Sequence, residues 1–168
     1  MVQQLMSIKI TVLITGPAGA GKSQFMYQLL DNSFTEVHVS MPQIAQKVLI
    51  GHPLQPYVTF AETELRFYQN ANICILCIDV RKPYLLSQQY NLTRQELPNK
   101  NCLLTILGTF SDVADKAQMD KFMLLGQKLG HVFLCSSKLR IGVEEVILAS
   151  INEYIEKYFV FDCSVKGL

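Results

Sequence analysis

Four short runs of apolar residues stand out along the chain, and each run is nearly continuous rather than alternating with polar residues. Such runs, when rich in β-branched residues, are typical of strands that are covered on both faces of a sheet. They predict strands at residues 8–14, 73–80, 102–107 and 131–135, with a weaker fifth at 48–50. The stretches between them predict helices at residues 22–31, 61–70, 85–96, 116–130 and 143–159. In the last stretch, apolar residues recur at helical spacing and charged residues face away.

The alternation of strands and helices predicts the fold class. It favours a three-layer α/β fold, in which helices cover both faces of a mostly parallel sheet of five or six strands. Ligands of such sheets bind at the carboxyl ends of the strands. The chain has 168 residues, 49% of them hydrophobic, which is enough for one sizeable core. Because no repeat, low-complexity tract or linker interrupts the sequence, we expect a single domain over residues 1–168.

Charge and cysteine usage exclude several classes of function. The net charge is +1, and the basic residues are spread out, so no basic stripe points to a nucleic acid. The apolar run at residues 8–14 is too short to span a bilayer, and neither terminus carries a lipidation motif. Five scattered cysteines suit a reducing compartment, so we expect a cytoplasmic protein without a membrane anchor.

The strongest motif lies directly after the first predicted strand and directly before the first predicted helix. Residues 16–23 match the pattern GxxxxGK[ST] in full. The glycines let the backbone wrap around a diphosphate, the lysine would reach the β- and γ-phosphates, and the serine hydroxyl would bind Mg²⁺. A glycine-rich turn without a ligand is the alternative, but such a turn requires neither the lysine nor the serine. The candidate phosphate-binding residues are Gly16, Ala18, Gly19, Ala20, Gly21, Lys22 and Ser23, with Ser23 also the candidate metal ligand.

With this loop in place, the chain resembles the Ras superfamily of small GTPases, of the Rab and Arf kind. FYQNANICILCIDV (67–80) is similar to the family's helix and fourth strand, and LLTILGTFSD (103–112) to its fifth strand and base-recognition motif. VFLCSSKLRIGVEEV (132–146) resembles the sixth strand, the SAK loop and the start of the last helix. The resemblance implies a Ras-like P-loop NTPase fold that binds GTP or GDP together with Mg²⁺.

The base-recognition motif is only partly kept. The family reads NKxD, whose aspartate accepts hydrogen bonds from guanine, whereas this chain has Thr109, Phe110, Ser111 and Asp112. The resemblance implies that Asp112 reads the base and that Phe110 offers a substitute stacking face. On residue chemistry alone, Asp112 is as well explained as a turn or helix-cap residue. By the same resemblance, the loop formed by Ser136, Ser137 and Lys138 flanks the base, although a serine-rich loop is also simply a loop.

The catalytic region departs from the family. The segment after the first predicted helix is short, so we expect the family's β-hairpin to be shortened or lost. At the end of the weak strand, Gly51 stands where the family's metal-binding Asp belongs and Leu54 where its γ-phosphate-sensing Gly belongs. Under one alignment Gln55 takes the place of the catalytic Gln. Because positioning of the water and of Mg²⁺ governs phosphoryl transfer, we expect slow or absent GTP hydrolysis, a degenerate or pseudo-GTPase.

Two further classes of function stay open. Asp79 closes a buried strand as a Walker B aspartate does, which keeps an ATPase or a small-molecule kinase under consideration. A non-enzymatic scaffold is the third reading, because loss of the hairpin would leave a sheet edge open to a protein partner or a second copy of the chain. Cys74 and Cys77 form a CxxC, but residues three apart on a strand face opposite ways, which predicts buried structural thiols.

Overall fold

The computed structural model describes residues 8–31, 44–48, 56–62 and 70–159. It contains six strands that form one sheet in the order β2-β3-β1-β4-β5-β6. The strands are β1 (Lys9–Thr15), β2 (Ile44–Val48), β3 (Tyr57–Glu62), β4 (Ile73–Asp79), β5 (Leu103–Thr109) and β6 (His131–Leu134). The helices are α1 (Lys22–Asp31), η2 (Pro83–Leu85), α2 (Leu86–Glu96), α3 (Lys116–Leu129) and α4 (Val143–Tyr158).

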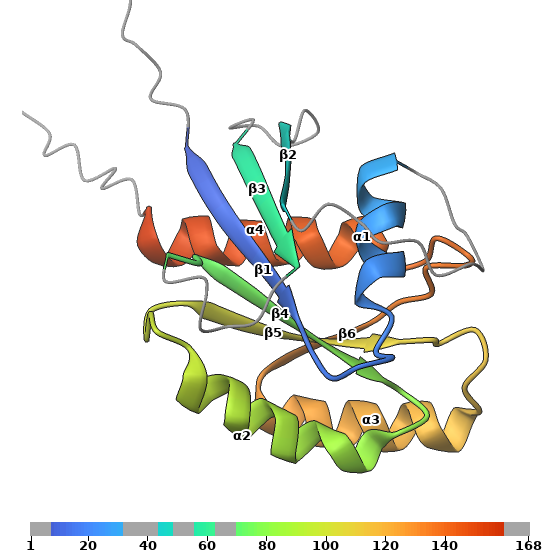
Figure 1. Cartoon of the computed structure of the whole chain (residues 1–168). Coiled ribbons are helices and arrows are strands. Elements are labelled where there is room, and N and C mark those ends of the chain that lie inside the picture. The colour runs from blue at the N-terminus through green and yellow to red at the C-terminus, as the bar shows by residue number, and fades with distance from the viewer. Residues whose placement is uncertain (1–7, 32–43, 49–55, 63–69, 160–168) are drawn as a thin grey trace, which may run out of the picture.

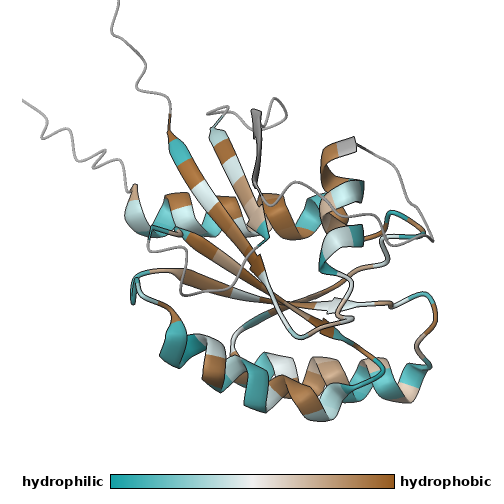
Figure 2. Ribbon diagram, in the orientation of Figure 1, coloured by the Kyte–Doolittle hydropathy of each residue, from teal (hydrophilic) through white to brown (hydrophobic). Residues whose placement is uncertain are grey.

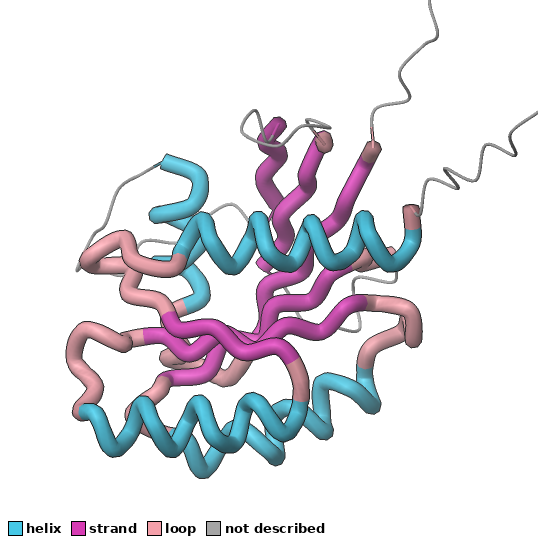
Figure 3. Tube along the Cα trace, turned by 180° about the vertical axis from the view of Figure 1, so that it is seen from behind, coloured by secondary structure: helices cyan, strands magenta, loops and turns pink. Residues whose placement is uncertain are grey.

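Two layers of helices cover the sheet (Figure 1). Helices α1 and α4 pack on one face, through an apolar cluster that includes Phe25 and Ile151. Helices α2 and α3 pack on the other face, through a second cluster that includes Leu86 and Phe122. The view from behind shows α4 crossing the sheet on the side opposite to α2 and α3 (Figure 3). The predicted three-layer α/β fold of the Ras-like kind is therefore confirmed.

The hydropathy of the strands explains this arrangement. The described residues of β4 and β5 are buried along their whole length, as strands covered on both faces must be. Figure 2 shows apolar residues concentrated in the central strands and polar residues on the outer sides of the helices. The described helices include none with the length and apolar character needed to cross a membrane.

The family's hairpin is present rather than lost, and its strands are short, with five residues in β2 and six in β3. Strand β2 pairs with β3 in antiparallel register from Ile44 opposite Ala61 to Val48 opposite Tyr57. The weak strand predicted at residues 48–50 shares only Val48 with β2. The predicted helix at residues 61–70 begins on the last two residues of β3, and residues 63–69 lie outside the described part of the chain. Because the hairpin is present, the premise that its loss opens a new sheet edge does not hold.

Parallel pairing brings the ends of the central strands to one edge of the sheet. Strand β1 pairs with β3 on one side and with β4 on the other, both in parallel. Strand β4 in turn pairs with β5, so that Asp79 lies opposite Thr109. The last residues of β1, β3, β4 and β5 therefore lie at the carboxyl edge of the sheet, where ligands of such sheets bind.

Candidate functional site

The loop from Gly16 to Ser23 connects β1 to α1, as the sequence predicts. Three of its glycines adopt positive φ angles, which are 142° at Gly16, 75° at Gly19 and 77° at Gly21. Residues other than glycine rarely adopt such backbone conformations. The loop is therefore shaped by its glycines, and the amino end of α1 begins at Lys22, where free backbone N–H groups and the helix dipole favour an anion.

Lys22 folds back over this loop. Its ammonium nitrogen Nζ donates hydrogen bonds to the carbonyl oxygens of Gly16, at 2.9 Å, and Pro17, at 3.0 Å. Both contacts are partly buried, and they hold the positive charge above the loop rather than in solvent. A phosphate group resting on the loop would meet this charge without rearrangement of the backbone.

Ser23 contacts a carboxylate that the sequence analysis did not identify. Its hydroxyl donates a hydrogen bond of 3.0 Å to Oε1 of Glu62. Glu62 is the last residue of β3 and lies opposite Ile14 in the parallel pairing with β1. The two side chains, 39 residues apart in sequence, thus meet directly beside the phosphate-binding loop.

This contact bears on the stretch of chain from which Gln55 was chosen. Gln55 lies outside the described residues, so its catalytic role stays a prediction. The strand that ends beside the loop is β3, not residues 48–50, and its last residue is Glu62. The alternating pattern of Tyr57–Glu62, ending on an acidic residue, was the available signal.

Ser23 and Glu62 are suited to the Mg²⁺ that the resemblance implies. The Ser23 hydroxyl and the Glu62 carboxylate are hard oxygen donors, and they lie 3.0 Å apart. Mg²⁺ prefers oxygen ligands and is commonly held by one or two protein groups together with phosphate oxygens and water. The residues present therefore fit a phosphate-bound Mg²⁺ at this position.

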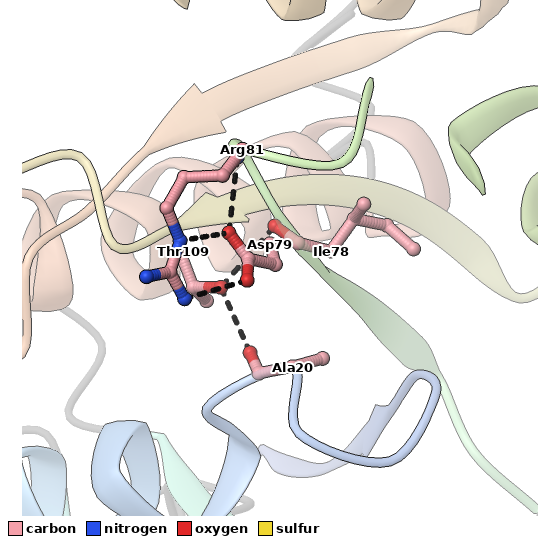
Figure 4. Close-up of polar contacts among 5 residues, drawn as sticks. All are labelled: Ala20, Ile78, Asp79, Arg81 and Thr109. Carbon is pink, nitrogen blue, oxygen red and sulfur yellow. Dashed lines mark hydrogen bonds and ion pairs between the residues drawn. The ribbon is translucent and has the colours of Figure 1, made fainter. Parts of the chain in front are cut away.

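The end of β5 is hydrogen-bonded to the phosphate-binding loop through Thr109. The hydroxyl of Thr109 donates to the carbonyl oxygen of Ala20 at 2.8 Å and lies 3.2 Å from that of Ile78 (Figure 4). Thr109 is only 2% exposed, so this bond is made away from solvent. The threonine thus ties the predicted base-recognition turn, the end of β4 and the phosphate-binding loop together.

Asp112 is held in place by the loop after β6. Its Oδ1 accepts a hydrogen bond of 2.8 Å from the hydroxyl of Ser136, which is fully buried. The helix-cap alternative for Asp112 is wrong, because Asp115 caps α3 in a capping box with Gln118. Asp112 itself is exposed, so its carboxylate is fixed in direction yet accessible.

Ser137 and Lys138 continue the same loop. Ser136 and Ile141 form a β-bridge that closes the loop, and the Ser136 hydroxyl also accepts a hydrogen bond from the backbone N–H of Leu139. Within it, Ser137 is half-buried and Lys138 is exposed. The structure therefore brings the 109–112 turn and the 136–138 loop together through the contact between Asp112 and Ser136.

Asp79 is engaged by a residue that the sequence analysis passed over. Its Oδ1 accepts hydrogen bonds from the backbone N–H and from Nε of Arg81, and its Oδ2 accepts one of 2.7 Å from Nη2 (Figure 4). Burial alone would raise the pKa of Asp79, but the hydrogen bonds and the charge of Arg81 lower it overall. Asp79 is therefore an ionised, paired carboxylate, and Glu62 is the carboxylate that contacts Ser23.

Phe110 occupies an unusual backbone conformation beside these residues. Its φ angle is 61°, one of two positive values among the described residues that are not glycine. The guanidinium carbon of Arg81 lies over the ring, 4.6 Å from its centroid, and the edge of the ring faces Gly21. The proposed stacking of Phe110 on a base stays a prediction.

The cysteines of the CxxC are buried on opposite faces of β4. Cys74 belongs to the cluster under α2 and α3, and Cys77 to the cluster under α1 and α4. Burial raises the pKa of both thiols well above its usual range. The prediction of buried structural thiols on opposite faces of the strand agrees with their burial here. Across the described part of the chain, no three His, Cys, Asp or Glu side chains gather at one point.

Comparison with known proteins bears on the family. No family model matches the chain. Ras-related protein RabG2 of Dictyostelium discoideum is 26% identical over 159 residues, covering 84% of this chain and 80% of its own length. Ras-related protein RabF1 of the same organism is 21% identical over 159 residues, covering 86% of this chain and 84% of its own length. The chain is thus a distant homologue of Rab proteins, within the Ras superfamily, over most of its length.

Proposed function

We propose that this chain, as a single domain, binds guanine nucleotides with Mg²⁺ and hydrolyses GTP slowly or not at all. The observation that supports this most directly is the convergence of three contacts at the carboxyl edge of the sheet. Lys22 donates to the loop carbonyls, Ser23 donates to Glu62, and Asp112 accepts from Ser136. These contacts supply the ammonium cation of Lys22, the side-chain oxygens of Ser23 and Glu62, and the hydrogen-bond acceptor of Asp112.

The phosphates would be bound by the loop. The backbone N–H groups at the start of α1 and the ammonium of Lys22, which contacts the loop carbonyls, would share the negative charge. Bound Mg²⁺ would neutralise part of the charge on the phosphates. Ser23 and Glu62 are the residues that would hold it, because both offer hard oxygen ligands.

The base would be read by Asp112. An ionised carboxylate accepts hydrogen bonds but cannot donate them, so it suits the N1–H and 2-amino group of guanine and not the acceptor N1 of adenine. The bond from Ser136 to Oδ1 fixes the direction of the carboxylate, and Thr109 fixes the turn that carries it. Ser137 and Lys138, on the adjoining loop, are proposed to flank the base.

Slow hydrolysis follows from the residues after Glu62. With Glu62 as the first position of the family's DxxGQ, the sequence reads Glu-Thr-Glu-Leu-Arg. Leu65 then stands in place of the glycine and Arg66 in place of the glutamine that positions water. Without a group that orients the attacking water, phosphoryl transfer loses much of its catalysis.

Single-turnover GTP hydrolysis is expected to proceed below about 10⁻⁴ s⁻¹, under the intrinsic rate of an active small GTPase. A double variant, Leu65→Gly with Arg66→Gln, restores the family's residues and should raise the rate at least about tenfold. Release of phosphate from pre-bound GTP, followed with excess protein, measures both. A wild-type rate at or above about 4 × 10⁻⁴ s⁻¹ contradicts the proposal of a degenerate enzyme.

The protein would then act as a regulatory or scaffolding module in the cytoplasm, with protein partners. Small GTPases are read by partners through segments that the γ-phosphate and Mg²⁺ hold in order and that are released on hydrolysis, so an effector or scaffold partner is proposed here. Self-association through the edge strand β2 stays a prediction. The alternative of an ATPase or a small-molecule kinase rested on Asp79 as a Mg²⁺ ligand. Both oxygens of this carboxylate accept hydrogen bonds from the guanidinium of Arg81.

A further inference from the structure

Arg81 is fixed by Asp79 at the end of β4. The carboxylate of Asp79 accepts from the backbone N–H, from Nε and from Nη2 of Arg81, at 3.0, 2.9 and 2.7 Å (Figure 4). The Asp79 side chain is 5% exposed and that of Arg81 is 42% exposed. A guanidinium held by two prongs on a buried carboxylate has a defined plane, which a lone surface arginine does not have.

That plane lies against Phe110. The guanidinium carbon is 4.6 Å from the centroid of the ring, within the range of a cation–π contact. Phe110 holds a φ angle of 61°, a conformation that costs free energy for an aromatic residue and persists only where neighbours enforce it. Arg81 is one such neighbour.

The phosphate-binding loop is the other. A Cβ atom placed on Gly21 would lie 3.2 Å from Cε2 and 3.3 Å from Cζ of Phe110, so the ring edge is packed closely on the loop backbone. Phe110 also lies between two residues of its own turn that make hydrogen bonds to other segments. Thr109 is hydrogen-bonded to Ala20, and Asp112 is hydrogen-bonded to Ser136.

We propose that Arg81 is a positioning residue for guanine-nucleotide binding. Arg81 is held by Asp79 and packs on Phe110, which keeps the ring against the phosphate-binding loop. The position of the turn that carries the Asp112 carboxylate is thereby fixed. The pair of Arg81 and Phe110 thus takes over the support that a lysine gives in the NKxD motif of the resembled family. This inference rests on the proposed function, because it assigns the pair a role in binding that nucleotide.

The test is a double-mutant cycle read out as the dissociation constant of GDP, measured by calorimetry on the full chain. Arg81→Ala should weaken GDP binding about five- to thirtyfold, the range expected for a partly desolvated cation–π contact. Phe110→Leu should weaken it by a similar factor. Because the two residues act as a unit, the double variant should bind GDP no more than about threefold worse than the weaker single variant.

Two further variants guard against an effect on folding alone. Arg81→Lys keeps the charge but not the two-pronged contact, so it should bind GDP about three- to tenfold more weakly than wild type, even if Arg81→Ala fails to fold. Arg94→Ala removes a comparable pair on α2, whose guanidinium carbon lies 5.6 Å from the ring centroid of Tyr90. It should leave GDP affinity unchanged.

The outcomes separate the inference from the function on which it rests. If wild type binds no guanine nucleotide, the proposed function fails and the inference falls with it. If wild type binds GDP but Arg81→Lys and Phe110→Leu bind it equally well, the function stands and the inference is wrong. Additive losses in the double variant also overturn it, because independent residues do not form one support.

Discussion

Lys22→Ala is expected to weaken GDP binding by about a hundredfold or more, since it removes charge-assisted hydrogen bonds to the phosphates. In the structure the ammonium already lies over the loop, bonded to the carbonyl oxygens of Gly16 and Pro17. The substitution therefore removes a cation that is positioned before the ligand arrives. Calorimetric titration of the nucleotide-free variant with GDP measures the loss.

Lys100→Ala is the matched control for this variant. Its ammonium makes the same kind of contact, with the carbonyl oxygens of Arg94 at 3.2 Å and Gln95 at 3.3 Å, but at the far end of α2. It should bind GDP as wild type does. If Lys22→Ala binds GDP within about threefold of wild type, the loop does not hold phosphate through Lys22.

Gly16→Ala is expected to destabilise the nucleotide-free protein by about 3 kcal/mol or more. A Cβ atom at this position would lie 2.2 Å from the carbonyl oxygen of Cys77, which belongs to the backbone of β4 and cannot move aside cheaply. The φ angle of 142° adds strain for any residue with a side chain. Urea unfolding at a fixed temperature gives the change in the free energy of unfolding.

Gly19→Ala separates the two causes. Its φ angle is also positive, at 75°, but nothing lies within 4 Å of a Cβ placed there. Gly19→Ala should therefore lower the free energy of unfolding by about 1 to 2 kcal/mol, the cost of the left-handed backbone conformation alone. Equal losses in the two variants would mean that the close approach of the loop to β4 does not limit the residue at position 16.

The strands and helices that could be predicted from sequence are those in which the pattern of buried residues follows a single rule along the element. Strands β4 and β5 are covered on both faces, so they appear as unbroken apolar runs. Helix α1 has the predicted bounds, because the glycine-rich motif fixes where it begins. The phosphate-binding loop followed from the same motif, whose residue types are set by the conformation that they must adopt.

Strand β3 was missed for a physical reason. Its residues Tyr57, Thr59 and Glu62 are half-buried and alternate with buried ones, which weakens the apolar signal. Ala61 and Glu62 also suit a helix, so the predicted helix began two residues inside the strand. This error hid the contact between Ser23 and Glu62.

The pairing of Arg81 with Phe110 could not be predicted from the sequence. It depends on the register of two parallel strands, which sets Asp79 opposite Thr109 although residues 80–102 separate the two strands in the sequence. It also depends on the positive φ angle of Phe110, which no local residue type requires. Periodicity identifies elements, but contacts between the ends of different strands come from the assembled sheet.

Titration of the nucleotide-free protein with GDP, GTP and ATP, with and without Mg²⁺, tests the central claim most directly. The account predicts that GDP and GTP bind about a hundredfold more tightly than ATP, through the hydrogen bonds that Asp112 accepts from guanine. It also predicts that Asp112→Ala removes this preference while keeping the phosphate-dependent part of the affinity. Equal or tighter binding of ATP, or no binding of any nucleotide, would contradict guanine recognition by this site.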